Sequence, residues 1–164
     1  MTAIRDASED DWELLRAIRL DALLNAPRAF VSTHGREAEY NEWQWREWLR
    51  RDLWLLAFAD LSSARPIGII AATQEPMEPC GEPFISSLWV NPEHRMRGIA
   101  KELIRAAADR VAARGAIAVS LWVLDGNEHA HKLYTAMGFV GTNDHQIAPG
   151  HSSLMERRMS KSLL

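Results

Sequence analysis

The chain has 164 residues, of which 47% are hydrophobic and 25% charged, enough apolar material for a single globular domain with its own core. Its 19 basic and 22 acidic residues give a net charge of −3, which argues against a protein built mainly to coat nucleic acid. One cysteine, Cys80, excludes an internal disulfide framework, and no stretch has the pattern of a signal peptide or a membrane span. We therefore expect one soluble, cytoplasmic domain over residues 1–164, without a membrane or nucleic-acid partner.

The first half of the chain alternates helical and strand patterns. Ser8 and the acidic residues after it are typical of a helix start, and apolar residues then recur at helical spacing as far as Pro27. This predicts a helix over 9–25. Residues 29–51 predict a loop that leads into a second, irregular helix. The apolar runs 54–60 and 66–74, separated by a polar turn, predict an antiparallel hairpin.

The second half predicts a strand at 82–90, a helix at 98–115, a strand at 116–124, a helix at 127–138, and two closing strands near 139–144 and 152–159. The first of these helices places six apolar residues on one face, namely Ile99, Leu103, Ile104, Ala107, Ala108 and Val111. Glycines at 115 and 138 mark the two helix ends. The order of elements predicts an α/β (α+β) fold with helices on both faces of a sheet.

One short segment combines features that suit phosphate binding. Pro92, Arg95, Arg97 and Gly98 lie where the strand at 82–90 passes into the helix at 98–115. Amides at a helix start are unpaired and partly positive, glycine permits close approach of the backbone, and arginine grips phosphate oxygens. A solvated basic loop that merely starts a helix explains the same residues equally well.

A second segment favours the binding interpretation. The corner reads R-x-x-G-x-A, and the later stretch "NEHAHKLYTAMGF" opens with an asparagine, carries a tyrosine two turns on and ends in Gly-Phe. Together, and in this order, the two segments resemble the signatures of the GNAT superfamily of acetyl-CoA-dependent N-acetyltransferases. The residues that carry the resemblance are Arg95, Gly98, Ala100, Asn127, Tyr134, Gly138 and Phe139.

The resemblance implies a GNAT-like fold, with a mixed, mostly antiparallel sheet of six to seven strands and about four helices. It also implies that an amine attacks acetyl-CoA directly and that CoA leaves as product. The amides from Met96 to Lys101 would hold the pyrophosphate, and the Val90 N–H would polarise the thioester carbonyl. Tyr134 would be the general acid. The implied cofactor-binding residues are Leu88, Trp89, Val90, Arg95, Met96, Arg97, Gly98, Ile99, Ala100, Lys101, Asn127 and Tyr134.

The general base stays unassigned. The two positions at which the family often carries a glutamate are Phe84 and Trp122 here, and neither side chain accepts a proton. The alternatives are a water chain through Ser86 or Ser87, and the side chains of His34, Glu37 and Glu39. The histidines form no metal-binding pattern, because His129 and His131 lie two residues apart on a helix and point in different directions.

The acceptor is open at this stage. We expect a primary amine of a small molecule, with protein N-terminal or lysine acetylation and a catalytically silent acyl-CoA sensor as alternatives. The loops at 27–42 and 141–152 flank the acceptor side in such folds and should distinguish a closed pocket from a peptide groove. The tryptophans at 43, 45, 48 and 54 either line an acceptor pocket or pack a helix against the sheet. A homodimer is one expectation for the oligomeric state.

Overall fold

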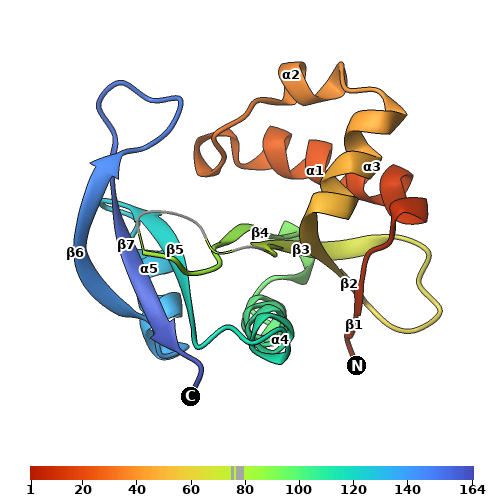
Figure 1. Cartoon of the computed structure of the whole chain (residues 1–164). Helices are drawn as coiled ribbons and strands as arrows, with labels where there is room; N and C mark the ends of the chain where they lie inside the picture. The colour runs from red at the N-terminus through yellow and green to blue at the C-terminus, as the bar shows by residue number, and fades with distance from the viewer. Residues whose placement is uncertain (75, 77–79) are drawn as a thin grey trace.

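The computed structural model describes residues 1–74, 76 and 80–164 (Figure 1). Within them, two antiparallel sheets lie side by side. The four-stranded sheet has the order β1-β2-β3-β4, and the three-stranded sheet has the order β5-β7-β6. The strands are β1 (Ala3–Asp6), β2 (Asp52–Phe58), β3 (Pro66–Thr73), β4 (Ile85–Val90), β5 (Ala118–Leu124), β6 (Val140–Ile147) and β7 (Met155–Ser162).

Helices cover both sides of the larger sheet, as the sequence predicts (Figure 1). The α-helices are α1 (Trp12–Asn25), α2 (His34–Ala38), α3 (Glu42–Arg51), α4 (Ile99–Ala113) and α5 (Glu128–Ala136). Short 3-10 turns precede α1 (η1, Glu9–Asp11), follow it (η2, Pro27–Ala29) and link β4 to α4 (η3, Pro92–His94). The predicted helix over 9–25 therefore begins with a 3-10 turn, and the irregular second helix is two helices, α2 and α3.

Strand β2 shows why the larger sheet is a central layer. Its alternate residues enter two different hydrophobic clusters: Leu53, Leu55 and Ala57 pack on the α4 side. Trp54, Leu56 and Phe58 pack on the side of α1 and α3. Successive side chains of a strand point to opposite faces, so a strand that is apolar throughout is buried on both. All six apolar positions predicted for one face of α4 are buried in the first cluster or beside it.

Strand β1 was absent from the sequence-based prediction. It pairs antiparallel with β2, with Ala3 opposite Phe58 and Asp6 opposite Leu55. Its four residues are only half buried or exposed, so they carry no apolar alternation from which a strand is recognised. The strand exists because β2 offers it a partner edge far along the chain.

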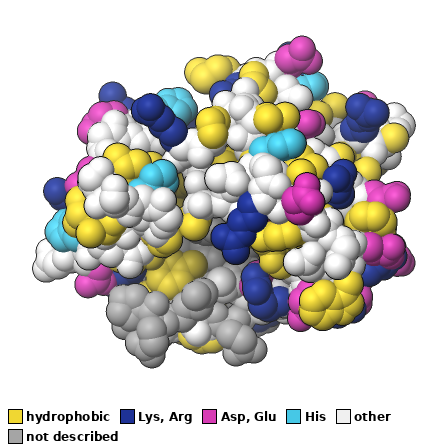
Figure 2. Space-filling view, turned by 90° about the horizontal axis from the view of Figure 1, so that it is seen from above, with side chains coloured by type: hydrophobic (Ala, Val, Ile, Leu, Met, Phe, Trp, Pro, Cys, Tyr) yellow, Lys and Arg dark blue, Asp and Glu magenta, His cyan; other side chains and the backbone are white. Residues whose placement is uncertain are grey.

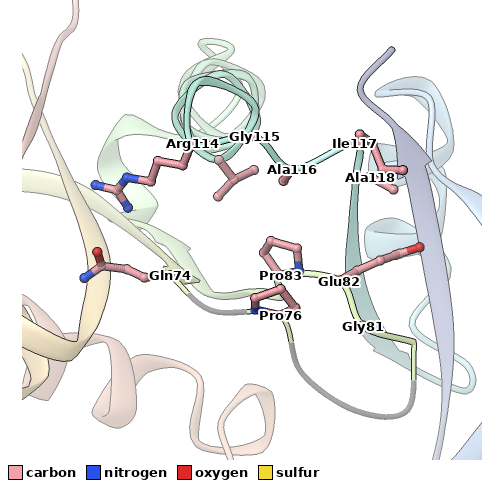
Figure 3. Close-up of a pocket in the computed structure, with 11 residues that line it drawn as sticks. Gln74, Pro76, Gly81, Glu82, Pro83, Arg114, Gly115, Ala116, Ile117 and Ala118 are labelled. Carbon is pink, nitrogen blue, oxygen red and sulfur yellow. The ribbon is translucent and has the colours of Figure 1, made fainter.

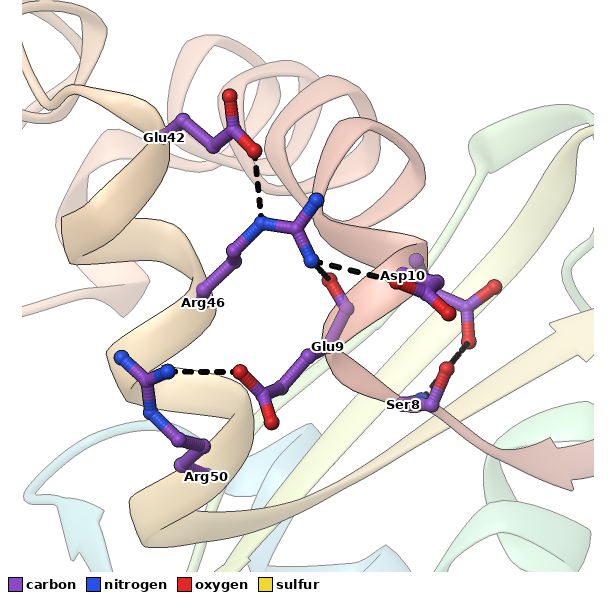
Figure 4. Close-up of polar contacts among 7 residues, drawn as sticks. Ser8, Glu9, Asp10, Glu42, Arg46 and Arg50 are labelled. Carbon is purple, nitrogen blue, oxygen red and sulfur yellow. Dashed lines mark hydrogen bonds and ion pairs between the residues drawn. The ribbon is translucent and has the colours of Figure 1, made fainter.

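Surface ion pairs hold the start of α1 against α3 (Figure 4). Arg46 donates to the Glu9 carbonyl at 3.0 Å and to the Glu42 carboxylate at 2.7 Å, and Arg50 donates to the Glu9 carboxylate at 2.7 Å. Exposed pairs of this kind contribute about 0–1 kcal/mol each. They fix the orientation of the two helices more than they stabilise the fold.

Candidate functional site

The two sheets meet at one point and separate beyond it. Strands β4 and β5 run parallel and are joined by a bridge between Phe84 and Ser120, where the Ser120 N–H donates to the Pro83 carbonyl at 2.9 Å. Beyond this bridge no ladder links the two strands in the part of the chain that the structure describes. The outer ends of β4 and β5 therefore leave backbone groups that face each other across a gap.

Aromatic rings close the narrow end of this gap. Phe84 and Trp122 stack with their ring centroids 6.4 Å apart and an interplanar angle of 17°. These are the two positions at which the family resemblance would place a carboxylate. The structure thus fills the usual base positions with an apolar pair that packs β4 against β5.

The edge of β4 presents a free amide to the gap. Asn91, just after the strand, donates its N–H to the Ile67 carbonyl of β3 at 2.8 Å. Because N–H groups alternate between the two sides of a strand, the Val90 N–H points away from β3, toward β5. The side chains of Leu88 and Val90 pack in the α4-side core. The geometry agrees with the role expected for the Val90 amide.

The corner after β4 has the backbone shape that the sequence suggested. Met96 and Gly98 have φ values of 61° and 83°, and Gly98 is the N-cap of α4 without any side-chain cap. The Glu102 N–H is bonded to the Gly98 carbonyl. The amides of Ile99, Ala100 and Lys101 ahead of it are those that a helix start leaves without intrahelical partners. They lie at the positive end of the helix dipole, where an anion is favoured.

The arginines of the corner divide into two roles. Arg95 donates to the Val90 carbonyl at 2.9 Å and to Asn25 Oδ1 at 2.9 Å, so its side chain ties the corner to β4 and to the end of α1. Trp89 donates to the same Asn25 oxygen at 3.1 Å. Arg97 is exposed, like Lys101. Among the predicted cofactor residues, Arg97 and Lys101 supply the cations open to a phosphate, while Arg95 shapes the loop.

The second signature segment lies at the end of β5. Asn127 accepts a hydrogen bond from the Ala130 N–H at 3.1 Å, so it caps α5. Tyr134 packs partly buried against the core, edge-on to Phe139 at 5.8 Å. Burial raises the pKa of Tyr134 to about 12. Within the described residues no hydrogen bond engages its hydroxyl, and the raised pKa keeps the phenol protonated at neutral pH.

Two cavities lie at the two ends of β5. One of about 410 Å³ lies at the end of β5 and the start of α5, and it is lined in part by Leu124, Asn127 and His131. The other, of about 230 Å³, lies where β4 and β5 begin and where α4 ends, between Gln74, Pro83 and Arg114 (Figure 3). Only the first includes a predicted cofactor residue, Asn127, so it belongs to the same side of the fold as the signatures.

The candidate bases differ in burial and in the contacts that their side chains make. Glu37 is fully buried and holds Arg19 in a bidentate pair, with both N–O distances 2.9 Å. Both carboxylate oxygens of Glu37 are thus engaged by Arg19, and no part of its side chain is exposed to an incoming amine. Glu39 and Ser86 are exposed, and His34 is half-buried. Among the described residues, no contact of these three side chains links them to β5, and the base stays unassigned.

Sequence reasoning missed Arg19 and Asn25. The burial of Arg19 could have been predicted from the sequence. Arg19 lies four residues after Leu15 and four before Leu23, on the buried stripe of α1. A charged residue on such a stripe needs a buried partner. Asn25 gave no comparable signal, since its partners Trp89 and Arg95 lie far along the chain.

The remaining expectations concern tryptophans, metals and charge. Trp45, Trp48 and Trp54 form an aromatic cluster with Tyr40, which settles their role as packing of α3 on the sheet. Trp43 is exposed.

The described residues hold no group of side chains suited to a metal ion and no helix long and apolar enough to cross a bilayer. The face in Figure 2 mixes acidic and basic side chains.

Comparison with known proteins identifies the family. The model of the acetyltransferase (GNAT) family matches residues 12–139. The chain belongs to this family. It is 24% identical over 157 residues to an uncharacterised N-acetyltransferase of Methanocaldococcus jannaschii, and the match covers 94% of the chain but only 66% of that relative.

Solved GNAT structures share the fold over nearly the whole chain. An acetyltransferase of the GNAT family from Streptococcus pneumoniae is 20% identical, with a TM-score of 0.77 and coverage of 99% of this chain and 100% of the other. The ribosomal-protein-alanine N-acetyltransferase of Brucella melitensis is 21% identical, with a TM-score of 0.78 and coverage of 98% and 99%. A putative acetyltransferase of Salmonella typhimurium, solved with acetyl-CoA, is 16% identical, with a TM-score of 0.77 and coverage of 99% and 94%. The expected fold class is thereby confirmed.

Proposed function

We propose that residues 1–164 form one GNAT domain that transfers the acetyl group of acetyl-CoA to a primary amine of a small molecule. Two groups of backbone amides support cofactor binding: the Val90 N–H on β4, and the N–H groups at the start of α4 after Gly98. The amides of Met96 to Lys101 suit the pyrophosphate. The Val90 amide suits the thioester carbonyl, whose oxygen gains charge during attack.

The chemistry is a direct transfer. The amine nitrogen forms a bond to the acetyl carbon, and the carbon–sulfur bond breaks to release the CoA thiolate. Tyr134 donates its phenolic proton to that sulfur, and its raised pKa keeps the phenol protonated at neutral pH. The proton lost by the amine passes to solvent, and the tyrosinate left at Tyr134 regains a proton from solvent.

Contact between two loops supports a small acceptor. Gly150, in the connection between β6 and β7, lies against Val31 in the connection between η2 and α2. A β-carbon built on Gly150 would be only 3.1 Å from the Val31 carbonyl oxygen. By the family resemblance these two loops flank the acceptor side, and their contact supports a closed acceptor pocket over an open peptide groove. Protein acetylation is the competing acceptor class, since the Brucella neighbour is named a ribosomal-protein-alanine N-acetyltransferase.

A thiol-release assay tests the proposal. Acetyl-CoA is supplied with a panel of small primary amines and, separately, with peptides that carry free N-termini or lysines. We expect turnover with at least one small amine and little with the peptides. Preference for a peptide would overturn the acceptor class, and CoA binding without turnover of any acceptor would favour a sensor.

The two tyrosines of the chain provide a matched pair for the acid. Tyr134→Phe should lower kcat while CoA binding and the melting temperature stay unchanged, because the phenol oxygen makes no hydrogen bond with the residues that the structure describes. Tyr40→Phe removes the same atom from the aromatic cluster beside α3 and should leave kcat as in the wild type. Equal kcat in the wild type and Tyr134→Phe would remove Tyr134 from the acid role.

A further inference from the structure

Strand β4 is irregular at one point. The register with β3 shifts between Ile69 and Ala71, so that Ser87 and Leu88 together stand opposite Ile70. Ser87 has a φ of 58°, in the left-handed backbone region that residues other than glycine rarely adopt. This is a β-bulge, and an extra residue of this kind changes which backbone groups face which side of a strand.

The bulge sets the direction of the amide that the proposed reaction needs. Before the bulge, the Phe84 carbonyl accepts a hydrogen bond from the Thr73 N–H of β3. After the bulge, the Asn91 N–H donates to the Ile67 carbonyl of β3. In a regular strand, every second residue turns its backbone groups to the same neighbouring strand. Phe84 and Asn91 are an odd number of positions apart, so a regular strand could not turn both of them toward β3. The bulge absorbs the difference and leaves the Val90 N–H turned toward β5.

A buried side chain from α1 holds the bulge. Arg19 donates from one terminal nitrogen to Ser87 Oγ at 3.0 Å. Its other two nitrogens donate to Glu37, and its guanidinium lies over the Phe30 ring at 4.6 Å. The side chain of Arg19 is only 7% exposed, so these contacts fix it in one position. Only a guanidinium can make the paired bonds to Glu37 and reach Ser87 together.

We propose that Arg19 is a positioning residue that acts through Ser87 to hold the β4 bulge and so aims the Val90 amide at the thioester oxygen. Glu37 fixes Arg19 in this arrangement and takes no proton from the substrate. The inference rests on the proposed acetyl transfer, in which the Val90 amide meets the developing oxyanion. Arg19 itself does not touch the reacting atoms.

Ser87→Ala is the first test, because it removes the tether and leaves the buried pair of Arg19 and Glu37 in place. We expect kcat to fall by about 10- to 100-fold, since small displacements of a positioned group have effects of that size. The dissociation constant of CoA should not change, because the amides after Gly98 are untouched. Ser162→Ala, an exposed serine at the end of β7, is the control and should match the wild type.

A double-mutant cycle tests whether Arg19 acts through Ser87. Arg19→Lys keeps the charge beside Glu37 but cannot reach both partners, and it should lower kcat by a similar factor. The double variant should be no slower than the slower single variant, because the two changes remove one contact. Multiplicative losses in the double variant would overturn the inference.

Two further measurements separate positioning from other roles. The pH profile of kcat in Ser87→Ala should keep its shape and fall by one factor throughout, whereas a shifted limb would show that Ser87 relays a proton instead. In ¹⁵N spectra the Leu88 and Val90 amide resonances should move in Ser87→Ala and stay fixed in Ser162→Ala. Unmoved amides would overturn the inference even if wild-type turnover failed, a result that would independently contradict the proposed function.

Discussion

Two glycines at opposite ends of α4 allow the loss of CoA binding at the proposed pyrophosphate site to be separated from the effect of backbone strain. Gly98 before the helix and Gly115 after it have φ values of 83° and 94°. A β-carbon added at either position meets no protein atom within 4 Å. Gly98→Ala and Gly115→Ala therefore introduce the same left-handed strain and no clash, and only Gly98 lies at the proposed pyrophosphate site.

The strain of each alanine follows from its backbone conformation. A left-handed residue other than glycine costs roughly 1–2 kcal/mol. For a protein of this size that corresponds to a fall in melting temperature of about 2–8 °C. Both variants should show it equally, which makes Gly115→Ala an internal standard for the damage done to the fold.

The CoA affinities should differ between the two variants. At Gly98 the methyl group occupies open space from which the pyrophosphate would approach the helix amides. Losing one charge-assisted hydrogen bond, about 1.5–3 kcal/mol, weakens CoA binding roughly 10- to 150-fold. Gly98→Glu adds like-charge repulsion and should abolish measurable binding. Titration calorimetry with CoA measures all three, and equal affinity in the two alanine variants would refute the assignment of the corner.

Other predictions concern pH. Because burial raises the pKa of Tyr134 to about 12, ionisation of Tyr134 should produce no alkaline limb in kcat below about pH 11, and a limb near pH 10 that vanishes in Tyr134→Phe would contradict this. The hydrogen bonds from Arg5 hold the pKa of Asp11 below its usual value. Their stabilisation is thus present above about pH 4 and lost as the pH falls through the folded-state pKa, so urea unfolding should separate Asp11→Asn from the wild type at pH 7 but not at pH 2. For different acceptor amines, the acidic limb of kcat/KM should follow the pKa of each amine, and a limb at one fixed pH for all amines would reveal a protein base.

Local patterns were sufficient for most of the fold. Helix α4 followed from six apolar residues at helical spacing and from the glycines at its two ends, all of which act within the helix or its immediate neighbours. The same holds for the hairpin of β2 and β3, where a polar turn separates two apolar runs. The backbone shape of the corner at which we propose phosphate binding was likewise visible, because helix starts and glycines act locally.

Features that depend on distant partners were not visible. Strand β1 has no strand pattern of its own and is defined by the edge of β2. Glu37 looked like a free carboxylate in a loop, because its partner Arg19 lies eighteen positions earlier on another helix. The conformation of Ser87 depends on both the register of β3 and the reach of Arg19, neither of which a single segment encodes.

The missing carboxylate follows from the same packing. Phe84 and Trp122 stack across the narrow end of the gap, and Phe84 is only 8% exposed. A glutamate at that position would lose its hydration without a cation to replace it, so the joint between the two sheets is apolar. An amine that approaches this joint loses hydration as well, which lowers its pKa and favours the neutral form. In the proposed reaction the apolar joint would therefore favour the neutral nucleophile without a protein base, and acceptors of different intrinsic pKa would differ in the pH at which they react.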